Sequence, residues 1–239
     1  MPTAVILCGQ ARFFRDTYQS IKNTILDVYT PDVYIHTWKH SNDIAYSAPW
    51  NRFGDIKISE NDINDYIALY NPVKYNVQSE LTNAEIDLAL KKDIYKNTSS
   101  PETKYNYYSY LYSLRQCYRL IDSPEKYDSF IVLRSDAYMY TFPEPSKIKI
   151  QVWNRLPNRT DGVIEAMVCI VPKQYMVTFV NIIDKLDDYY DKGYKFNYEE
   201  MTYAHLKETH LYDYIELLPT KDFEFGLQRK NIIENIFSA

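Results

Sequence analysis

Residues 3–12, TAVILCGQAR, contain an apolar run that ends at one glycine. The run predicts a buried strand over Ala4–Cys8, with a turn of the backbone at Gly9. DVYIHTW predicts a second strand over Val33–Thr37. Between the two, apolar side chains recur at helical spacing, namely at Phe14, Tyr18, Ile21, Ile25 and Val28. A strand, a helix and a strand in this order form a βαβ unit with parallel strands and a right-handed crossover, so we expect an α/β fold.

Helix and strand signals alternate along the rest of the chain. Ser59 with Asp62, and Thr82 with Glu85, have the capping-box spacing, in which side chains satisfy free amides at a helix N-terminus. A long helix at 104–122 leads to FIVLRSDAYMY (130–140), whose first residues predict a buried strand. The remaining patterns predict strands at 74–77, within 163–172 and within 214–219, and helices at 173–193 and 199–210.

Two segments of the second half have less regular patterns. Residues 143–162 show few helix signals, and we expect them to wrap the edge of the sheet. The helix predicted over 173–193 has an apolar stripe expected to face inward, formed by Met176, Phe179, Val180, Ile183, Leu186 and Tyr190. No repeat or low-complexity linker interrupts the chain. We therefore predict one α/β domain over residues 1–239, with a mostly parallel central sheet flanked by helices on both faces.

The composition excludes several classes of protein. A net charge of −5 over 239 residues argues against a nucleic-acid partner bound through a broad basic face. No apolar run approaches the length of a transmembrane segment, and no signal-peptide pattern precedes the first strand. Cys8, Cys117 and Cys169 lie far apart in apolar surroundings, which is typical of reduced core thiols. We expect a cytoplasmic protein.

Polar clusters follow three of the predicted strands. They are Gly9-Gln10-Ala11-Arg12, His36-Thr37-Trp38 and Arg134-Ser135-Asp136. Ligands of open α/β sheets bind beyond the carboxyl ends of parallel strands, so the clusters are expected to share one site. Arg12 and Arg134 suit phosphate oxygens. Asp136 suits Mg²⁺ or Mn²⁺, because these cations prefer carboxylate oxygens.

Other motifs point to no alternative site. GxGxxG, GxxxxGK[ST] and GxSxG are absent, which removes the main support for dinucleotide, P-loop and α/β-hydrolase chemistry. His205 and His210 are five residues apart and lack the spacing of a zinc-binding helix. Glu199 and Glu200 begin a predicted helix; they are candidate site carboxylates or simply favourable charges at a helix N-terminus.

AVILCGQAR, DVYIHTW and the passage from YNYYSYLYSLRQCYRLI to YDSFIVLRSDAYMY together resemble a known family. This family is the nucleotide-sugar glycosyltransferases of GT-A fold found in bacterial capsule and lipopolysaccharide loci and in large DNA viruses. The resemblance extends to about residue 140, with weaker similarity at DGVIEAMVC and EEMTYAHL.

The resemblance implies a role for each strand end. Gly9, Gln10 and Arg12 would face the nucleotide, with His36 and Trp38 in the same nucleotide-sugar site. Arg134-Ser135-Asp136 would occupy the position of the DxD motif that holds the metal and the donor diphosphate. Arg134 replaces the first acid of that motif, so Asp136 is left as the metal ligand for Mn²⁺ or Mg²⁺. Whether the metal is required stays open, since Arg134 can supply part of the positive charge.

The interpretation that follows is a glycosyltransferase of glycan biosynthesis, moving a hexose or pentose from a nucleoside-diphosphate sugar to a glycan or glycoconjugate acceptor. Residues 1–140 are expected to bind the donor and residues 141–239 to form the acceptor side. Candidate catalytic carboxylates are Asp161, Glu199 and Glu200, with Glu165 as a further option. Two alternatives remain, a sugar-nucleotide nucleotidyltransferase and a non-catalytic glycan-binding domain on a degenerate transferase fold.

Overall fold

The computed structural model describes residues 1–39, 58–90, 101–153, 164, 166–218 and 220–225. Seven strands form the central sheet in the order β3-β2-β1-β4-β7-β6-β8. Their bounds are β1 Thr3–Cys8, β2 Asp32–Lys39, β3 Lys74–Ser79, β4 Ser129–Leu133, β6 Ile150–Trp153, β7 Cys169–Pro172 and β8 Ile215–Leu218. A second, two-stranded sheet pairs β5 (Ala137–Met139) with β9 (Phe223–Phe225).

The central sheet is mostly parallel. β1 pairs in parallel with β2 and β4, β2 with β3, and β6 with β8. β7 pairs antiparallel with both β4 and β6, so it alone runs against the other strands of this sheet. The carboxyl ends of β1, β2 and β4 therefore lie at one edge, as expected for a site built from strand ends.

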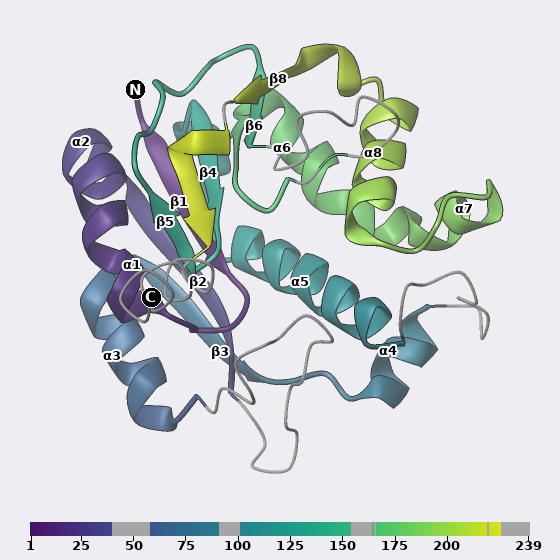
Figure 1. Ribbon diagram of the computed structural model, residues 1–239, viewed down its shortest axis with the longest axis horizontal. Helices are drawn as coiled ribbons and strands as arrows, with labels where there is room; N and C mark the ends of the chain where they lie inside the picture. The colour runs from purple at the N-terminus through teal and green to yellow at the C-terminus, as the bar shows by residue number, and fades with distance from the viewer. Residues whose placement is uncertain (40–57, 91–100, 154–163, 165, 219, 226–239) are drawn as a thin grey trace, which may run out of the picture.

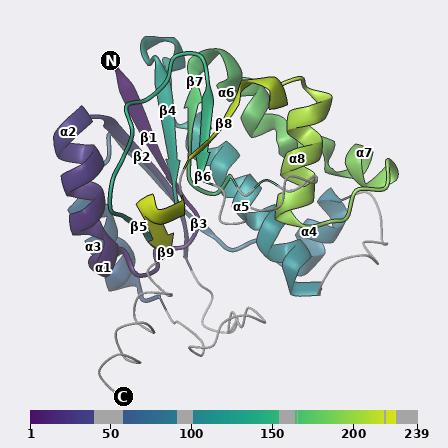
Figure 2. The same cartoon turned by 45° about the horizontal axis from the view of Figure 1, so that its top comes forward.

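Helices cover both faces of the sheet (Figures 1 and 2). One face carries α1 (Phe14–Ile21), α2 (Asp27–Tyr29) and α3 (Glu60–Tyr70), and the other carries α5 (Pro101–Arg119) and α6 (Lys173–Val180). Side chains of a strand point alternately to its two faces, and β1 follows this rule. Val5 and Leu7 pack in the α1–α3 layer, whereas Ile6 and Cys8 pack under α5. The structure confirms the α/β fold class predicted from the sequence.

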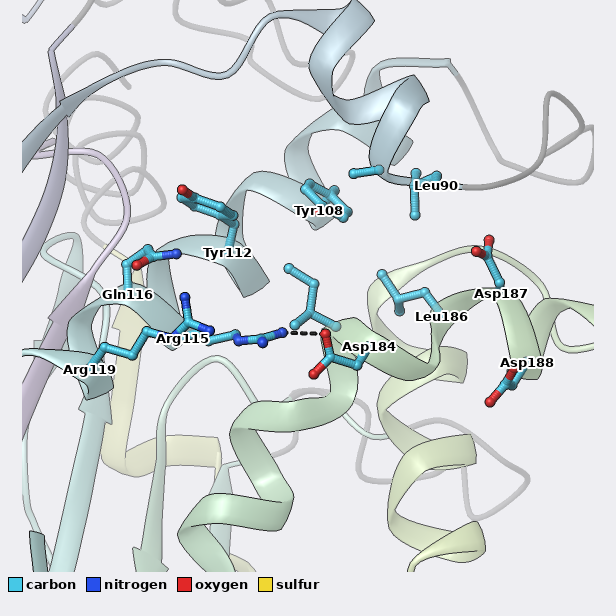
Figure 3. Close-up of a pocket in the computed structure, with 12 residues that line it drawn as sticks. Leu90, Tyr108, Tyr112, Arg115, Gln116, Arg119, Asp184, Leu186, Asp187 and Asp188 are labelled. Carbon is cyan, nitrogen blue, oxygen red and sulfur yellow. Dashed lines mark hydrogen bonds and ion pairs between the residues drawn. The ribbon is translucent and has the colours of Figure 1, made fainter.

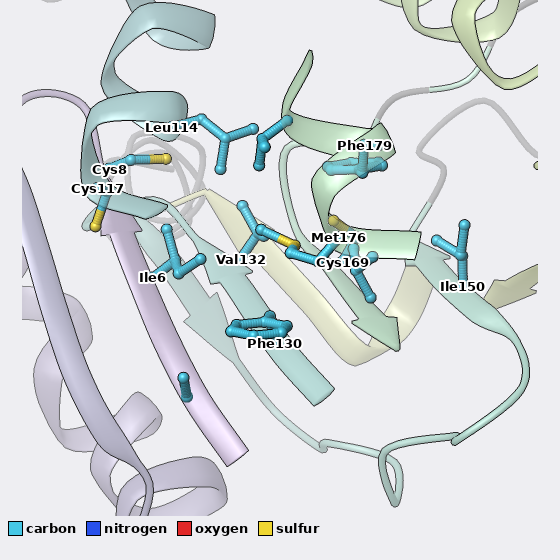
Figure 4. Close-up of a cluster of buried hydrophobic side chains, with 14 of the residues drawn as sticks. Ile6, Cys8, Leu114, Cys117, Phe130, Val132, Ile150, Cys169, Met176 and Phe179 are labelled. Atoms are coloured by element: carbon cyan, nitrogen blue, oxygen red, sulfur yellow. The ribbon is translucent and has the colours of Figure 1, made fainter. Parts of the chain in front are cut away.

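The core under α5 and α6 contains all three cysteines (Figure 4). Cys8, Cys117 and Cys169 are free and buried among Ile6, Val132, Phe179 and neighbouring apolar side chains. Burial raises the pKa of the Cys8 thiol to about 12, because a thiolate would lose its hydration there. The three thiols are therefore neutral packing groups, in agreement with the expectation of reduced core cysteines.

Both predicted capping boxes are present. The Ser59 hydroxyl accepts from the backbone N–H of Asp62 at the start of α3, and the Asp62 carboxylate accepts from the backbone N–H of Ser59. Thr82 and Glu85 exchange the same pair of bonds at the start of α4 (Asn83–Ala89). The spacing in the sequence was sufficient to predict both capping boxes, because each box uses atoms of only four consecutive residues.

Three expectations about packing were wrong. A π-helical segment, Lys22–Leu26, follows α1 and rotates the later residues around the axis, so Val28 leaves the apolar stripe predicted from helical spacing and is 59% exposed. A 3-10 segment, Asn181–Lys185, separates α6 from α7 (Leu186–Asp191) and changes the helical phase in the same way. Tyr189 is buried there, whereas Tyr190 is only half-buried. Finally, 150–153 do not wrap the sheet; they form β6 between β7 and β8.

The last described α-helix, α8 (Tyr198–Glu208), packs beside α7 and precedes β8. Among the described residues, none of the helices combines the length and apolar character needed to cross a membrane. The assignment of residues 1–140 to donor binding and of residues 141–239 to the acceptor side stays a prediction.

Candidate active site

The loops after β1 and β4 meet at the carboxyl edge of the sheet, where Ser135 joins them. Its hydroxyl contacts the carbonyl oxygens of Gln10 at 2.6 Å and Arg12 at 3.0 Å, and accepts from the Arg12 backbone N–H at 3.1 Å. From α1, the Thr17 hydroxyl donates to the Ser135 carbonyl at 2.5 Å. Two of the three predicted clusters are thus directly bonded, and Ser135 acts as a structural link between them.

Asp136 lies beneath two arginines and is 1% exposed. The Nε and Nη2 atoms of Arg134 donate to its two carboxylate oxygens at 2.8 Å and 2.6 Å, and Nη2 of Arg12 lies 3.5 Å from Oδ2. Burial by itself raises the pKa of a carboxyl, but the charges of Arg134 and Arg12 outweigh it and lower the pKa of Asp136. Asp136 is therefore ionised at neutral pH. We call Arg12, Arg134, Ser135 and Asp136 the strand-tip site.

The charged groups of the strand-tip site are two guanidinium groups and one carboxylate. The side chains of Arg12 and Arg134 are 22% and 19% exposed, so both reach the surface while Asp136 holds them from below. Such an arrangement fixes the orientation of guanidinium planes before a ligand arrives. It suits an anion with several oxygens, such as a diphosphate.

His36 belongs to the internal support of this edge. Its Nδ1 lies 2.8 Å from the Ser113 hydroxyl of α5 and its Nε2 lies 3.3 Å from Oε1 of Gln78 on β3. The ring is fully buried, and that burial lowers the pKa of His36 to about 4, which keeps it neutral. Gly9 has a φ of 104°, and its N–H faces the His36 carbonyl at 3.2 Å and the Ser113 hydroxyl at 2.8 Å. Gly9 is therefore needed for its backbone conformation.

Trp38 continues this internal layer. It stacks on Tyr112 of α5 with ring centroids 5.8 Å apart and packs edge-on against His36 at 4.9 Å. The Gln78 side-chain amide donates to the Tyr112 hydroxyl at 3.3 Å. Trp38 is buried, so its ring supports the edge from within. Gln10 is half-buried, and its amide donates to Glu80 at 3.2 Å.

The candidate catalytic carboxylates fall into two groups. Asp161 and Glu165 lie outside the described residues. Glu199 and Glu200 are in the first turn of α8. Glu200 supports that helix start: its carboxylate accepts from the Lys195 backbone N–H at 3.1 Å and from Asn197 at 3.4 Å. The favourable helix-terminus role considered from the sequence is therefore present for Glu200, whatever further role it has.

A chain of contacts connects α8 with the strand-tip site. Arg134 contacts the Met167 sulfur at 3.0 Å, and the Tyr110 hydroxyl of α5 donates to the Met167 carbonyl at 3.4 Å. The Tyr110 ring lies 5.4 Å from that of Tyr198, the residue before Glu199. The structure thus brings the start of α8 to the same side of α5 as Arg134. The catalytic role of Glu199 stays a prediction.

Sequence reasoning missed the residues that hold the site together from neighbouring helices. Ser113 and Tyr112 come from α5, and Thr17 comes from α1. Ser113 and Thr17 are fully buried hydroxyls in amphipathic helices. A buried hydroxyl needs a hydrogen-bond partner on the element that packs against it. A small polar residue on the inward face of a predicted helix was therefore the signal that could have identified Ser113 and Thr17.

A divalent cation does not fit Asp136 in this arrangement. Both carboxylate oxygens are bonded to Arg134, and Arg12 adds a second positive charge at 3.5 Å. Mg²⁺ and Mn²⁺ need several oxygen ligands around them, whereas two guanidinium groups surround this carboxylate. Among residues with described positions, no group of three or more Asp, Glu, His or Cys side chains could hold a metal ion. The side chains around Asp136 are organised for ion pairing.

No protein-family model matches the chain, and no curated protein sequence matches it significantly. Solved structures do match over most of its length. Mouse xyloside xylosyltransferase 1, in its apo form, has a TM-score of 0.45 at 10% identity, covering 91% of this chain and 84% of that chain. The galactosyltransferase LgtC, solved with donor and acceptor sugar analogues, has a TM-score of 0.48 at 12% identity, covering 91% of this chain and 73% of that chain.

A third match is core-mannan synthase A from Aspergillus fumigatus in a form with Mn and GDP, with a TM-score of 0.48 at 9% identity. It covers 86% of this chain and 69% of that chain. With identities of 9–12% and TM-scores of 0.45–0.48, these matches transfer neither a donor, an acceptor nor a metal to this chain.

Proposed function

We propose that the protein is a glycosyltransferase that moves a sugar from a nucleoside-diphosphate donor to a glycan or glycoconjugate acceptor. The observation that carries the proposal is the strand-tip site, where Arg12 and Arg134 are held by Asp136 at the carboxyl edge of parallel strands. A diphosphate matches this site in charge and in the number of its oxygens. The donor sugar is a hexose or a pentose.

In the proposed reaction the strand-tip arginines act on the leaving group. The bond between the anomeric carbon and the diphosphate oxygen breaks, and its electron pair stays on the nucleoside diphosphate. An acceptor hydroxyl oxygen bonds to the anomeric carbon. Negative charge grows on the leaving oxygen as this bond breaks, so guanidinium groups already in place stabilise the transition state. Asp136 is a positioning residue in this scheme, because it touches the arginines.

The acceptor hydroxyl must lose its proton. For transfer with inversion a carboxylate takes it, and our candidates are Asp161, Glu199 and Glu200. The contacts of Glu200 with Lys195 and Asn197 favour a structural role for that residue. Glu199 stays a candidate on α8, supported by the contacts that join Tyr198 to Tyr110 and Met167.

We further propose that Arg134 and Arg12 provide the positive charge that a metal supplies at a DxD motif. No step of this scheme passes through Mn²⁺ or Mg²⁺, because Asp136 is occupied by the arginines.

The test is a thermal-shift panel of nucleoside diphosphates and nucleoside-diphosphate sugars, with Mn²⁺ and with EDTA, followed by measurement of donor hydrolysis. A ligand present at about 100 times its Kd stabilises the folded state by about 2.7 kcal/mol. We expect a shift with at least one diphosphate in EDTA, together with slow release of nucleoside diphosphate from a sugar donor.

Each component of the proposal has its own contrary result. If no nucleoside diphosphate shifts the melting temperature, the proposed donor site is wrong. Binding without donor hydrolysis or transfer to any acceptor would favour a non-catalytic glycan-binding domain. Formation of a nucleotide sugar from a nucleoside triphosphate and a sugar phosphate would favour a nucleotidyltransferase. A shift or turnover that disappears in EDTA and returns with Mn²⁺ would contradict the role given to the two arginines.

A further inference from the structure

A pocket of about 370 Å³ lies against α5. α4 and α5 form part of its wall, and the segment from Asn181 to Asp191 forms the rest (Figure 3). We call it the α5 pocket. Its volume falls in the range of about 300–1,000 Å³ that is typical of small-molecule sites. None of the four strand-tip residues lines it.

Two tyrosines of α5 give the pocket aromatic walls. Tyr108 and Tyr112 are one helical turn apart and both line it (Figure 3). Burial raises the pKa of Tyr108, and the nearby Tyr112 and the carboxylates of Asp184 and Asp187 add to the increase despite Arg115. The Tyr108 hydroxyl is therefore neutral and remains both a donor and an acceptor.

Charges of both signs surround these rings. Arg115 forms an ion pair with Asp184 that joins α5 to the segment before α7, as Figure 3 shows. Arg119 lies beyond Arg115 on α5, and Asp187 and Asp188 stand on the opposite wall. Two guanidinium groups and three carboxylates give no strong excess of one sign. The pocket therefore differs from the strand-tip site and is poorly suited to a phosphate group.

This combination matches a neutral molecule rich in hydroxyl groups. Carboxylates accept hydrogen bonds from hydroxyls, and guanidinium groups donate to them, so both kinds of partner are present. The tyrosine rings offer apolar surface for the C–H faces of a pyranose. A lipid or an apolar peptide would leave the charged walls without suitable partners.

The α5 pocket adjoins the carboxyl edge through one residue. Tyr112 lines the pocket, stacks on Trp38 at 5.8 Å, and accepts from Gln78, which also contacts His36. A ligand on Tyr112 would thus rest on the same aromatic layer that supports the strand ends.

We propose that the α5 pocket is a binding site for neutral saccharides. Naming its occupant as the acceptor glycan rests on the proposed glycosyltransferase function, whereas saccharide binding does not. The experiment therefore measures saccharide binding without nucleotide and nucleotide binding without saccharide.

Saturation-transfer NMR with lactose, maltose and cellobiose, and with a sulfated disaccharide for comparison, tests the assignment. We expect at least one neutral disaccharide to bind wild-type protein. Tyr108→Ala should weaken that binding by about tenfold, because it removes an aromatic wall. Tyr108→Phe keeps the ring and should retain most of the binding. Tyr75→Ala, at an exposed tyrosine of β3 outside the pocket, is the matched control and should change binding by less than about twofold.

The circular dichroism spectrum and melting curve of each variant establish that it is folded. If Tyr108→Ala does not fold, Asp184→Asn takes its place, since Asp184 is half-exposed and also lines the pocket.

The assignment is overturned if none of the neutral disaccharides binds, if the pocket variant binds like wild type, or if the sulfated disaccharide binds more tightly than the neutral ones. A diphosphate thermal shift that persists when saccharide binding fails would overturn the pocket and leave the proposed function standing. Saccharide binding without any diphosphate thermal shift would overturn the proposed function and leave the pocket assignment standing.

Discussion

The strand-tip site and the α5 pocket both pair arginine with aspartate, but they hold these charges differently. Asp136 is almost entirely buried, with both oxygens bonded to Arg134 and with Arg12 nearby. In the α5 pocket, Asp184 is half-exposed where it meets Arg115. Water screens an exposed ion pair strongly, whereas a buried charge depends on its partners. The strand-tip charges are therefore part of the folded architecture, whereas the ion pair between Arg115 and Asp184 contributes little to stability.

The largest expected effect comes from Asp136→Asn. The amide keeps the shape but leaves two guanidinium groups without their carboxylate. Breaking a buried pair by removing one partner costs about 3–5 kcal/mol. Because the arginines are partly exposed, we expect a loss of about 3 kcal/mol. Urea denaturation measures this change. A loss below about 1 kcal/mol would mean that the charges at the strand tip are solvated like those of the pocket.

The next effect is a pH dependence that arises from the buried histidine of β2. Burial lowers the pKa of His36 from 6.5 to about 4. Between these values the unfolded chain binds more protons, so stability is fully present above pH 6.5 and is lost as the pH falls toward 4. The slope is at most about 1.4 kcal/mol per pH unit for each such group.

His205 of α8 has its pKa lowered to about 4 by the same cause and should add an equal slope. Denaturation series between pH 7 and pH 5 on wild type, His36→Gln and His205→Gln separate the two contributions. If the slope is unchanged in His36→Gln, burial inside β2 does not hold His36 neutral.

An intermediate effect is expected for diphosphate binding. Arg134→Ala should weaken nucleoside-diphosphate binding by about tenfold, and Arg134→Lys should recover only part of it, because lysine lacks the planar fork. Isothermal titration in EDTA makes the measurement. Arg115→Ala, in the α5 pocket, is the matched control with unchanged diphosphate affinity. Equal losses in both variants would show that the two regions share one anion site.

The smallest effect is expected in the pocket itself. Asp184→Asn removes a half-exposed partner of Arg115, and such pairs are worth about 0.2–1 kcal/mol. We expect the free energy of unfolding to fall by less than about 0.5 kcal/mol at 0.15 M salt, as measured in urea. A larger loss would place the ion pair among the structural charges and weaken the contrast with Asp136.

Local features of this protein were predictable from the sequence. The strands that begin near Ala4, Val33 and Phe130, and the capping boxes at Ser59 and Thr82, appear where their patterns indicated. Alternating burial, helical spacing and capping depend on the conformation of a few consecutive residues. The parallel pairing of β1 with β2 was expected from the strand–helix–strand order. The loops after β1 and β4 meet at one edge, but His36, Thr37 and Trp38 lie inside β2 and are buried, so the third cluster does not follow its strand as predicted.

Only the tertiary structure decided how those clusters are used. The sequence placed Asp136 at a strand end, but the packing of two loops turned it into a buried partner of Arg12 and Arg134. Packing likewise set β6 between β7 and β8, and made Ser113 a partner of Gly9 and His36. These contacts join segments distant in sequence. Their formation depends on the relative burial and pairing energies of whole elements, which no local pattern of residues records.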